Sequence, residues 1–259
     1  CYYAVSGWMY HYYIGYDRGI SCKNLYGSEA ASHIFCQGYE CQRGRNTVEG
    51  RYVIVNTILY LKVWAHKAIG YIADGQYKGQ GNPAPSILKR KTVAAYAKEY
   101  QCNILVETGT YLGEMVEYQA KNFRRIFSIE IADIFYDFSS KRLRKYENIS
   151  IIKGDSSVEL GKVCEKISPE DRVLFWLDGH YSGGQTGKGE KECPIYEELT
   201  NIFNIRADKD VILIDDARCF NGQGDYPALP ELSAFIKKRR PNANIEIKDD
   251  MIRVIFVTE

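Results

Sequence analysis

The sequence has almost no excess of charge of either sign. Its 34 Lys and Arg side chains nearly balance its 33 Asp and Glu side chains, and the formal net charge is +1 at pH 7. A protein that binds nucleic acid through its overall charge carries a marked basic excess. The composition therefore gives no reason to expect a nucleic-acid partner.

The cysteines lack the spacing of a zinc or redox motif. The eight of them stand at positions 1, 22, 36, 41, 102, 164, 193 and 219 and form no Cys-x-x-Cys pair. A chain of 259 residues can bury a substantial core without disulfides, so we expect a reducing compartment and a cytoplasmic protein. The chain begins at Cys1 with no recognisable secretory signal, and we expect it to be a fragment or a processed piece.

Residues 1–80 lack regular alternation of strands and helices, with one exception. Between Val53 and Ile72, apolar side chains recur at steps of four and three residues, which predicts an amphipathic helix. We expect it to pack on the main domain or on a second subunit; a membrane-surface helix is the weaker alternative. Polar side chains within the helix argue against a membrane span: Asn56, Lys62, His66 and Lys67.

A Gly, Pro and polar linker, Asp74 to Ser86, is the best candidate for a domain boundary. We expect residues 1–81 to form a Tyr- and Cys-rich, partly helical segment that serves in docking or homo-oligomer formation. We expect residues 82–259 to form the main domain.

After the linker, apolar strands and helices alternate. Such alternation predicts an α/β fold: a Rossmann-like, mostly parallel sheet with helices on both faces. A closing pair of strands within 244–257 predicts an antiparallel edge. The expected strands before it are 103–107, 125–130, 149–154, 172–178 and 210–216, and the expected helices are 86–100, 113–123, 134–146, 157–166, 193–203 and 227–240.

The stretch "ETGTYLG", residues 107–113, places glycines where the first strand becomes a helix. Glycines there let the backbone approach a ligand, and ligands of open α/β sheets bind at the carboxyl ends of strands. The second strand ends in Glu130, which suits the two hydroxyls of a ribose, and Asp155 after the third could accept from an adenine amino group.

This order of motifs resembles the cofactor site of class I S-adenosylmethionine (SAM)-dependent methyltransferases over about residues 84–259. The resemblance implies that SAM is the cofactor. It places Glu107, Gly109, Thr110 and Gly113 at the methionine portion, Glu130 at the ribose, and Asp155 with Ser156 at the adenine.

Two later strands also end in acids: Asp178 in "FWLDGH", and Asp215 with Asp216 in "ILIDDA". Three carboxylates at one rim of the sheet cannot all stay charged without a counter-charge. Oxygen ligands of this kind suit Mg²⁺ or a similar divalent cation. We therefore expect a metal site. The alternative is a purely structural role, in which these acids cap neighbouring loops and helices.

An Asp after the fourth strand and an Asp-Asp after the fifth resemble the divalent-metal O-methyltransferases, and most closely the macrocin O-methyltransferase-like group. That resemblance implies Mg-assisted methylation of a sugar, glycan or glycosylated small-molecule hydroxyl. His180, with an ordinary pKa near ~6.5, is the candidate base, and Asp178 is the competing one. Two rival functions remain: a nucleotide- or SAM-binding module without transfer, and a metal-independent N- or C-methyltransferase.

Overall fold

The computed structural model describes residues 48–76, 83–179 and 191–256. The chain divides into two compact units, residues 1–51 and 52–259. Only residues 48–51 of the first unit are described, so the fold below is that of the second.

The second unit is built on a mostly parallel sheet with strand order β3-β2-β1-β4-β5-β7-β6. Strands β1 to β5 run parallel, whereas β7 pairs antiparallel with both β5 and β6. The predicted fold class, with its closing antiparallel pair, is therefore confirmed. The strands are β1 Ile104–Thr108, β2 Arg125–Glu130, β3 Ile149–Lys153, β4 Val173–Leu177, β5 Val211–Ile214, β6 Ala243–Lys248 and β7 Met251–Phe256.

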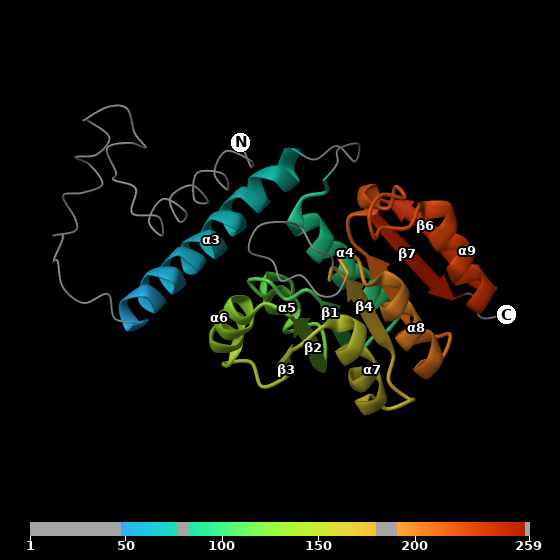
Figure 1. The fold of residues 1–259 in the computed structure, drawn as a ribbon, viewed down its shortest axis with the longest axis horizontal. Helices are drawn as coiled ribbons and strands as arrows, with labels where there is room; N and C mark the ends of the chain where they lie inside the picture. Colours follow the sequence, from blue (N-terminus) through green and yellow to red (C-terminus); the bar gives the residue numbers. More distant parts are fainter. Residues whose placement is uncertain (1–47, 77–82, 180–190, 257–259) are drawn as a thin grey trace. The chain divides into compact units, whose positions relative to one another are not determined.

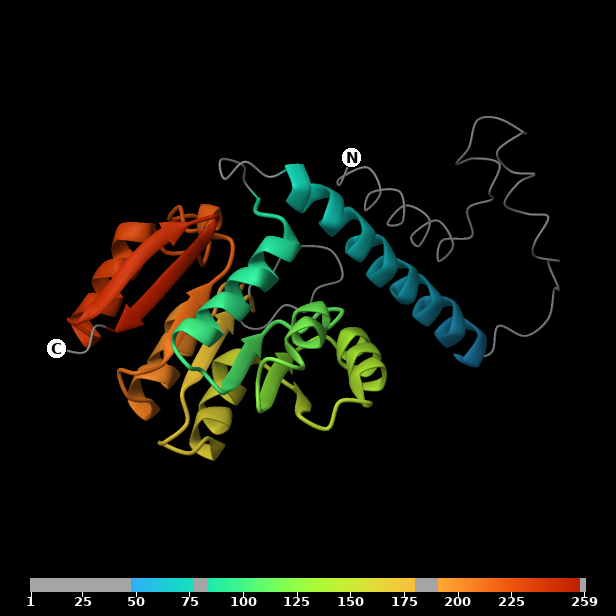
Figure 2. The ribbon, with the colours of Figure 1, turned by 180° about the vertical axis from the view of Figure 1, so that it is seen from behind.

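Helices cover both faces of the sheet, as Figures 1 and 2 show from opposite sides. Alternate residues of each central strand enter separate apolar cores, because successive side chains of a strand point to opposite faces. One core contains side chains of α7 Ser156–Lys166, α8 Ile195–Ile205 and α9 Leu229–Arg239. The other contains side chains of α4 Ser86–Glu99, α5 Glu114–Gln119 and α6 Asp133–Leu143.

The crossing between β1 and β4 positions the candidate site. The chain moves outward from β1 through β2 to β3, and then returns to place β4 on the other side of β1. At such a switch point the loops after the two neighbouring strands leave toward opposite faces, and a crevice forms at their carboxyl ends. The residues that follow Thr108 and Leu177 therefore lie at the place where ligands bind in open α/β sheets.

Helix α3, Val48–Gln76, includes the predicted 53–72 and is longer at both ends. Leu59 and Val63 are buried in a small apolar cluster with Leu112, Phe135 and Phe138, and so attach the helix to the α5–α6 side of the domain. The opposite side of α3 exposes large apolar side chains, among them Leu61 and Trp64. None of the helices described is both long and apolar enough to cross a membrane.

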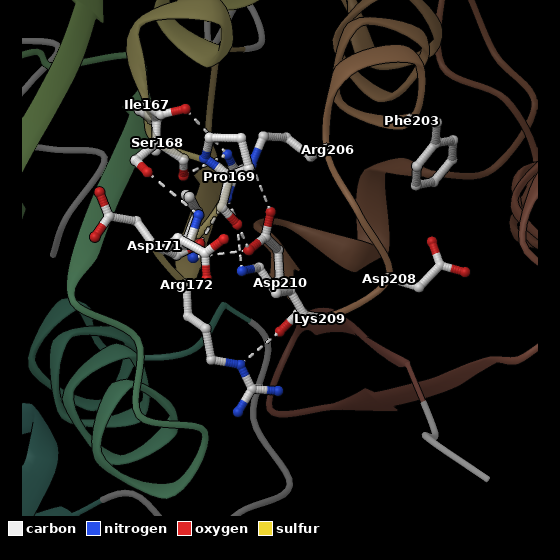
Figure 3. A network of polar contacts seen from close by, with 12 residues as sticks. Ile167, Ser168, Pro169, Asp171, Arg172, Phe203, Arg206, Asp208, Lys209 and Asp210 are labelled. Carbon is white, nitrogen blue, oxygen red and sulfur yellow. Dashed lines mark hydrogen bonds and ion pairs between the residues drawn. The ribbon is translucent and has the colours of Figure 1, made fainter.

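A polar network joins the segments that lead into β4 and β5 at their amino ends (Figure 3). The buried guanidinium of Arg206 pairs with Asp210 at 2.8 Å and donates to the carbonyl of Asp171 at 2.8 Å. Asp210 also accepts from the backbone N–H of Val173 at 2.8 Å. Because the candidate site lies at the carboxyl ends of the strands, this network supports the opposite edge of the sheet.

Candidate active site

The glycine turn after β1 directly contacts the end of β4. Gly109 has φ +83°, and a Cβ placed on it would lie 2.4 Å from the carbonyl oxygen of Asp178. Gly113, with φ +70°, caps α5, and a Cβ there would lie 2.7 Å from Leu143 Cδ1. Both positions therefore need glycine for backbone conformation and for space. The turn and the Asp178 segment form one packed unit.

A buried hydrogen-bonded chain runs beneath this turn. The Ser128 hydroxyl donates to the carboxylate of Glu107, and the hydroxyls of Thr110 and Ser128 lie 2.6 Å apart. Burial raises the pKa of Glu107 well above its usual range; the hydrogen bond from Ser128 opposes the shift, and the charges of Asp178 and Glu130 add to it. The shift favours the neutral form of the Glu107 carboxyl, and a cation bound nearby would favour the ionised form.

Glu130 holds the glycine turn from the end of β2. Its carboxylate accepts from the backbone N–H of Tyr111 at 2.7 Å and from that of Ala132 at 2.8 Å. Tyr111 has φ +48°, a left-handed conformation that the bond to Glu130 helps to keep. Burial raises the pKa of Glu130, against those backbone hydrogen bonds. Each carboxylate oxygen can accept more than one bond, so the predicted ribose contact stays compatible with this role.

Asp155 begins α7 as its N-cap and accepts from the backbone N–H of Ser157 at 2.9 Å. Ser156 is buried beside the β4 loop: a Cβ on Gly179 would lie 3.1 Å from its hydroxyl and 2.9 Å from Glu198 Oε1. The third strand end and the fourth therefore meet at Gly179. The adenine role of Asp155 and Ser156 stays a prediction.

The predicted acids after β4 and β5 come together. The two strands are neighbours and pair Leu177 with Ile214. The backbone N–H of Asp178 donates to the carbonyl of Thr108 at 3.1 Å, and that of Asp215 donates to the carbonyl of Leu177 at 3.0 Å. These bonds extend the sheet pairing by one residue, so the carboxylates start from adjacent points of the same edge.

The counter-charge that these acids require is a lysine from α4. The ammonium of Lys89 lies 2.6 Å from one carboxylate oxygen of Asp215 and 2.7 Å from the other, and 2.9 Å from Asp216 Oδ1. Burial alone would lower the pKa of Lys89, but the charges of Asp215, Asp216 and Asp178 outweigh burial and raise it. Lys89 therefore stays charged.

Asp216 is held by a second cation. Arg218 donates to Asp216 Oδ1 at 2.7 Å and also pairs with the buried carboxylate of Asp250. Asp216 itself has φ +52°, and its backbone N–H donates to Asp215 Oδ1 at 2.7 Å. The Asp-Asp pair is thus fixed in an unusual turn by ionic contacts on both sides.

The predicted divalent-metal site at Asp178, Asp215 and Asp216 does not fit this arrangement. A metal ion would need the carboxylate oxygens of Asp215 and Asp216, and the ammonium of Lys89 already engages them. Among the residues described, no cluster of three His, Cys, Asp or Glu side chains has a geometry that could hold a metal. The sequence indicated a need for positive charge at these acids, and among the residues described Lys89 supplies one.

His180 and the glycine-rich run that follows it lie outside the described residues, within 180–190. The choice between His180 and Asp178 as the base therefore stays open. Nothing local in the sequence indicated Lys89, Ser128 or Glu198, which all lie in this region. Arg218, two residues after the Asp-Asp pair, is the one cation that proximity in sequence could have suggested.

The chain has the fold of class I SAM-dependent methyltransferases, as comparison with solved structures shows. The SAH-bound methyltransferase PaMTH1 of Podospora anserina is 15% identical over 75% of this chain and 88% of that one, with a TM-score of 0.50. The O-methyltransferase TomG of Streptomyces achromogenes, involved in tomaymycin synthesis and solved with SAM, is 16% identical over 69% of this chain and 83% of that one, also with a TM-score of 0.50.

No family model matches the sequence, and the search of curated proteins gives no match either. The likeness therefore concerns the fold. It does not extend to the macrocin-like subgroup or to the acceptor.

Proposed function

We propose that this chain is a SAM-dependent methyltransferase that methylates an oxygen atom. The observation that carries the proposal is the contact of Gly109 with Asp178, which sets a glycine turn against the end of β4 at the switch point. The neighbouring strand ends bring Glu130 and Asp155 to the same edge of the sheet. Within the observed fold, this is where a nucleoside with a methionine tail would bind.

The electrostatics of the site support a cationic ligand. Burial and the charges of Asp178 and Glu130 raise the pKa of Glu107 despite the hydrogen bond from Ser128, so the neutral form of this carboxyl is favoured while no cation is bound. A positive group bound nearby would favour the ionised form. SAM meets this requirement, because when bound it supplies a methyl group activated by the positive charge of its sulfonium.

The residues of the β4–β5 edge suit a hydroxyl acceptor. Asp178 is half-buried, and its charge raises the pKa of Lys89, so a carboxylate and an ammonium lie near each other at this edge of the sheet. A carboxylate there can take a proton from a hydroxyl, with His180 as the alternative base. No step is assigned to Mg²⁺. A sugar, glycan or glycosylated small molecule is proposed from the resemblance of residues 177–199 to the macrocin-like group.

Calorimetric titration of the full chain with SAM and with SAH tests the cofactor. We expect both ligands to bind. Glu130→Gln should weaken the binding of each at least ~10-fold (1.4 kcal/mol per tenfold change), because a carboxylate that accepts hydrogen bonds beside the glycine turn is lost. Glu147→Gln, an exposed carboxylate outside the site, is the matched control and should bind as the wild type. A folded chain that binds neither ligand would refute the proposal.

Transfer of labelled methyl from SAM to a panel of sugars and glycosides tests the reaction. Mass spectrometric location of the methyl group on oxygen supports the proposal. Label on nitrogen or carbon would favour the N- or C-methyltransferase instead. Binding of SAM without transfer to any acceptor would favour a binding module.

A further inference from the structure

Lys89 contacts the carboxylates of Asp215 and Asp216 from a part of the chain that is distant in sequence. It belongs to α4, which packs on one face of the sheet, and its partners follow β5, 126 and 127 residues later. Its ammonium reaches both oxygens of Asp215 and one oxygen of Asp216 within 2.6–2.9 Å. The side chain of Lys89 is 13% exposed, and that of Asp215 is 4% exposed.

We propose that the ammonium of Lys89 is the resident cation of this site in place of a divalent metal ion, and that an acceptor hydroxyl binds against it. The first part rests on the contacts of Lys89 alone. The second part rests on the proposed function, because it assumes that an acceptor enters this edge of the sheet.

The surroundings fix Lys89 as the cation. Asp215 accepts from the backbone N–H of Asp216 as well as from Lys89, and Asp216 is tied on its other side by Arg218. A divalent ion entering here would have to displace an ammonium held by both carboxylates. It would also leave that ammonium half-buried beside a second positive charge, which is costly.

The ammonium also determines which acceptor fits. It has three N–H donors, and its hydrogen bonds run to Asp215 and Asp216. Three carboxylate oxygens already lie within 2.9 Å of it, so an incoming ligand oxygen would have to share one of these donors with Asp215 or Asp216. A metal ion with open positions would instead bind two neighbouring oxygens of a diol or catechol at once. The site therefore favours an acceptor that presents a single hydroxyl to Asp178 and Lys89.

Titration of the full chain with Mn²⁺ alone tests which cation occupies the site. Calorimetry and the electron paramagnetic resonance signal of free Mn²⁺ report the binding. The wild type should show no site-specific binding. Lys89→Ala leaves the carboxylates of Asp178, Asp215 and Asp216 without this counter-charge, and it should bind Mn²⁺ at least ~10-fold more tightly than the wild type. The matched control is Lys98→Ala, an exposed lysine of the same helix, which should behave as the wild type.

Lys89→Met is the second variant in case Lys89→Ala does not fold, because it keeps the length of the side chain while removing the charge. Wild-type protein that binds one Mn²⁺, with the binding lost in Asp215→Asn, would overturn the proposal. So would folded Lys89 variants that bind Mn²⁺ no better than the wild type.

The proposed binding of an acceptor hydroxyl against Lys89 is tested by a separate measurement. Methyl transfer by the wild type should be unchanged by EDTA, and Lys89→Met should lose at least ~10-fold in transfer while it keeps its affinity for SAM. Loss of transfer on chelation, restored by Mg²⁺, would contradict it. If SAM does not bind the wild type at all, the proposed function fails, whereas the Mn²⁺ titration still decides whether Lys89 is the resident cation.

Discussion

At the scale of single residues, Gly109 has the closest approach to a Cβ position among the glycines that the structure describes. It combines a positive φ with a backbone oxygen 2.4 Å from where a side chain would begin. Gly222 has nearly the same φ, +82°, but a Cβ there would meet its nearest atom at 3.6 Å. Substitution of each glycine by alanine therefore separates the energetic cost of the left-handed backbone from the cost of a steric clash with Asp178.

We expect Gly222→Ala to lower the free energy of unfolding by about 1 kcal/mol, the cost of a left-handed alanine. Gly109→Ala should cost a further ~1–3 kcal/mol, because the turn after β1 must move away from Asp178. Urea unfolding of both variants measures the difference, and SAM calorimetry should show weaker binding for Gly109→Ala only. Equal losses of stability would mean that the close approach is unimportant.

The positions of most candidate site residues at one edge of the sheet were predictable from sequence because each follows an apolar strand. Glu107, Glu130, Asp178 and Asp215 all stand at or just after such a run, and parallel pairing brings strand ends together. Lys89 was not predictable in this way. It lies in the first turn of α4, and nothing local marks a lysine whose partners are more than 100 residues away.

At the scale of elements, α3 is attached through one narrow stripe. Leu59, 3% exposed, contributes to that stripe, while Leu61 two residues later is 61% exposed. His66 Nδ1 lies 3.0 Å from a carboxylate oxygen of Glu114 in α5, within hydrogen-bond distance, and Lys67 forms an ion pair with Glu117 of α5 at 2.8 Å. The helix thus contacts the element that follows the glycine turn. Self-association through its exposed side stays a prediction.

We expect Leu59→Ala to lower the free energy of unfolding by about 2–5 kcal/mol, because it leaves a cavity beside Phe135 and Phe138. Leu61→Ala removes the same atoms from an exposed position and should change stability by no more than ~0.5 kcal/mol. Chemical denaturation of the two variants measures this contrast. A similar effect of both would show that α3 does not pack on the domain as described.

Strands were predicted more accurately than helices. The run "RIFSIE" corresponds residue for residue to β2, because a buried strand is a continuous apolar segment bounded by polar residues. The helix expected at 113–123 instead ends at Gln119 as α5, where Asn122 donates to the Gln119 carbonyl at 2.8 Å and turns the chain. The expected helix 53–72 extends to 48–76, with no proline in that range to stop it.

At the scale of the whole molecule, the two edges of the sheet have different roles. The carboxyl ends of β1, β2, β4 and β5 are followed by the candidate site, while the amino ends of β4 and β5 are joined by Arg206 and Asp210 (Figure 3). Both side chains of that ion pair are almost completely buried, at 3% and 0% exposure. Removal of one partner would leave the other as an uncompensated charge. The predicted boundary near residue 81 stays a prediction.

Asp210→Ala should therefore lower the free energy of unfolding by about 3–5 kcal/mol. Asp208→Ala, two residues earlier, removes a more exposed partner of Arg240 and should cost no more than ~1 kcal/mol. Thermal and urea unfolding test the difference. Affinity for SAM, measured below the unfolding transition, should be unchanged in both variants; a loss in Asp210→Ala would contradict the separation of the two edges.

The contact between Gly109 and Asp178 has a thermodynamic consequence. The turn that would receive the methyl donor and the segment that would meet the acceptor touch through backbone atoms, so neither can shift without displacing the other. Coupling between two binding events is reciprocal: whatever free energy the donor adds to acceptor binding, the acceptor returns to donor binding. A change that loosens this contact would therefore alter the donor's effect on the affinity for the acceptor and the acceptor's effect on the affinity for the donor by the same factor.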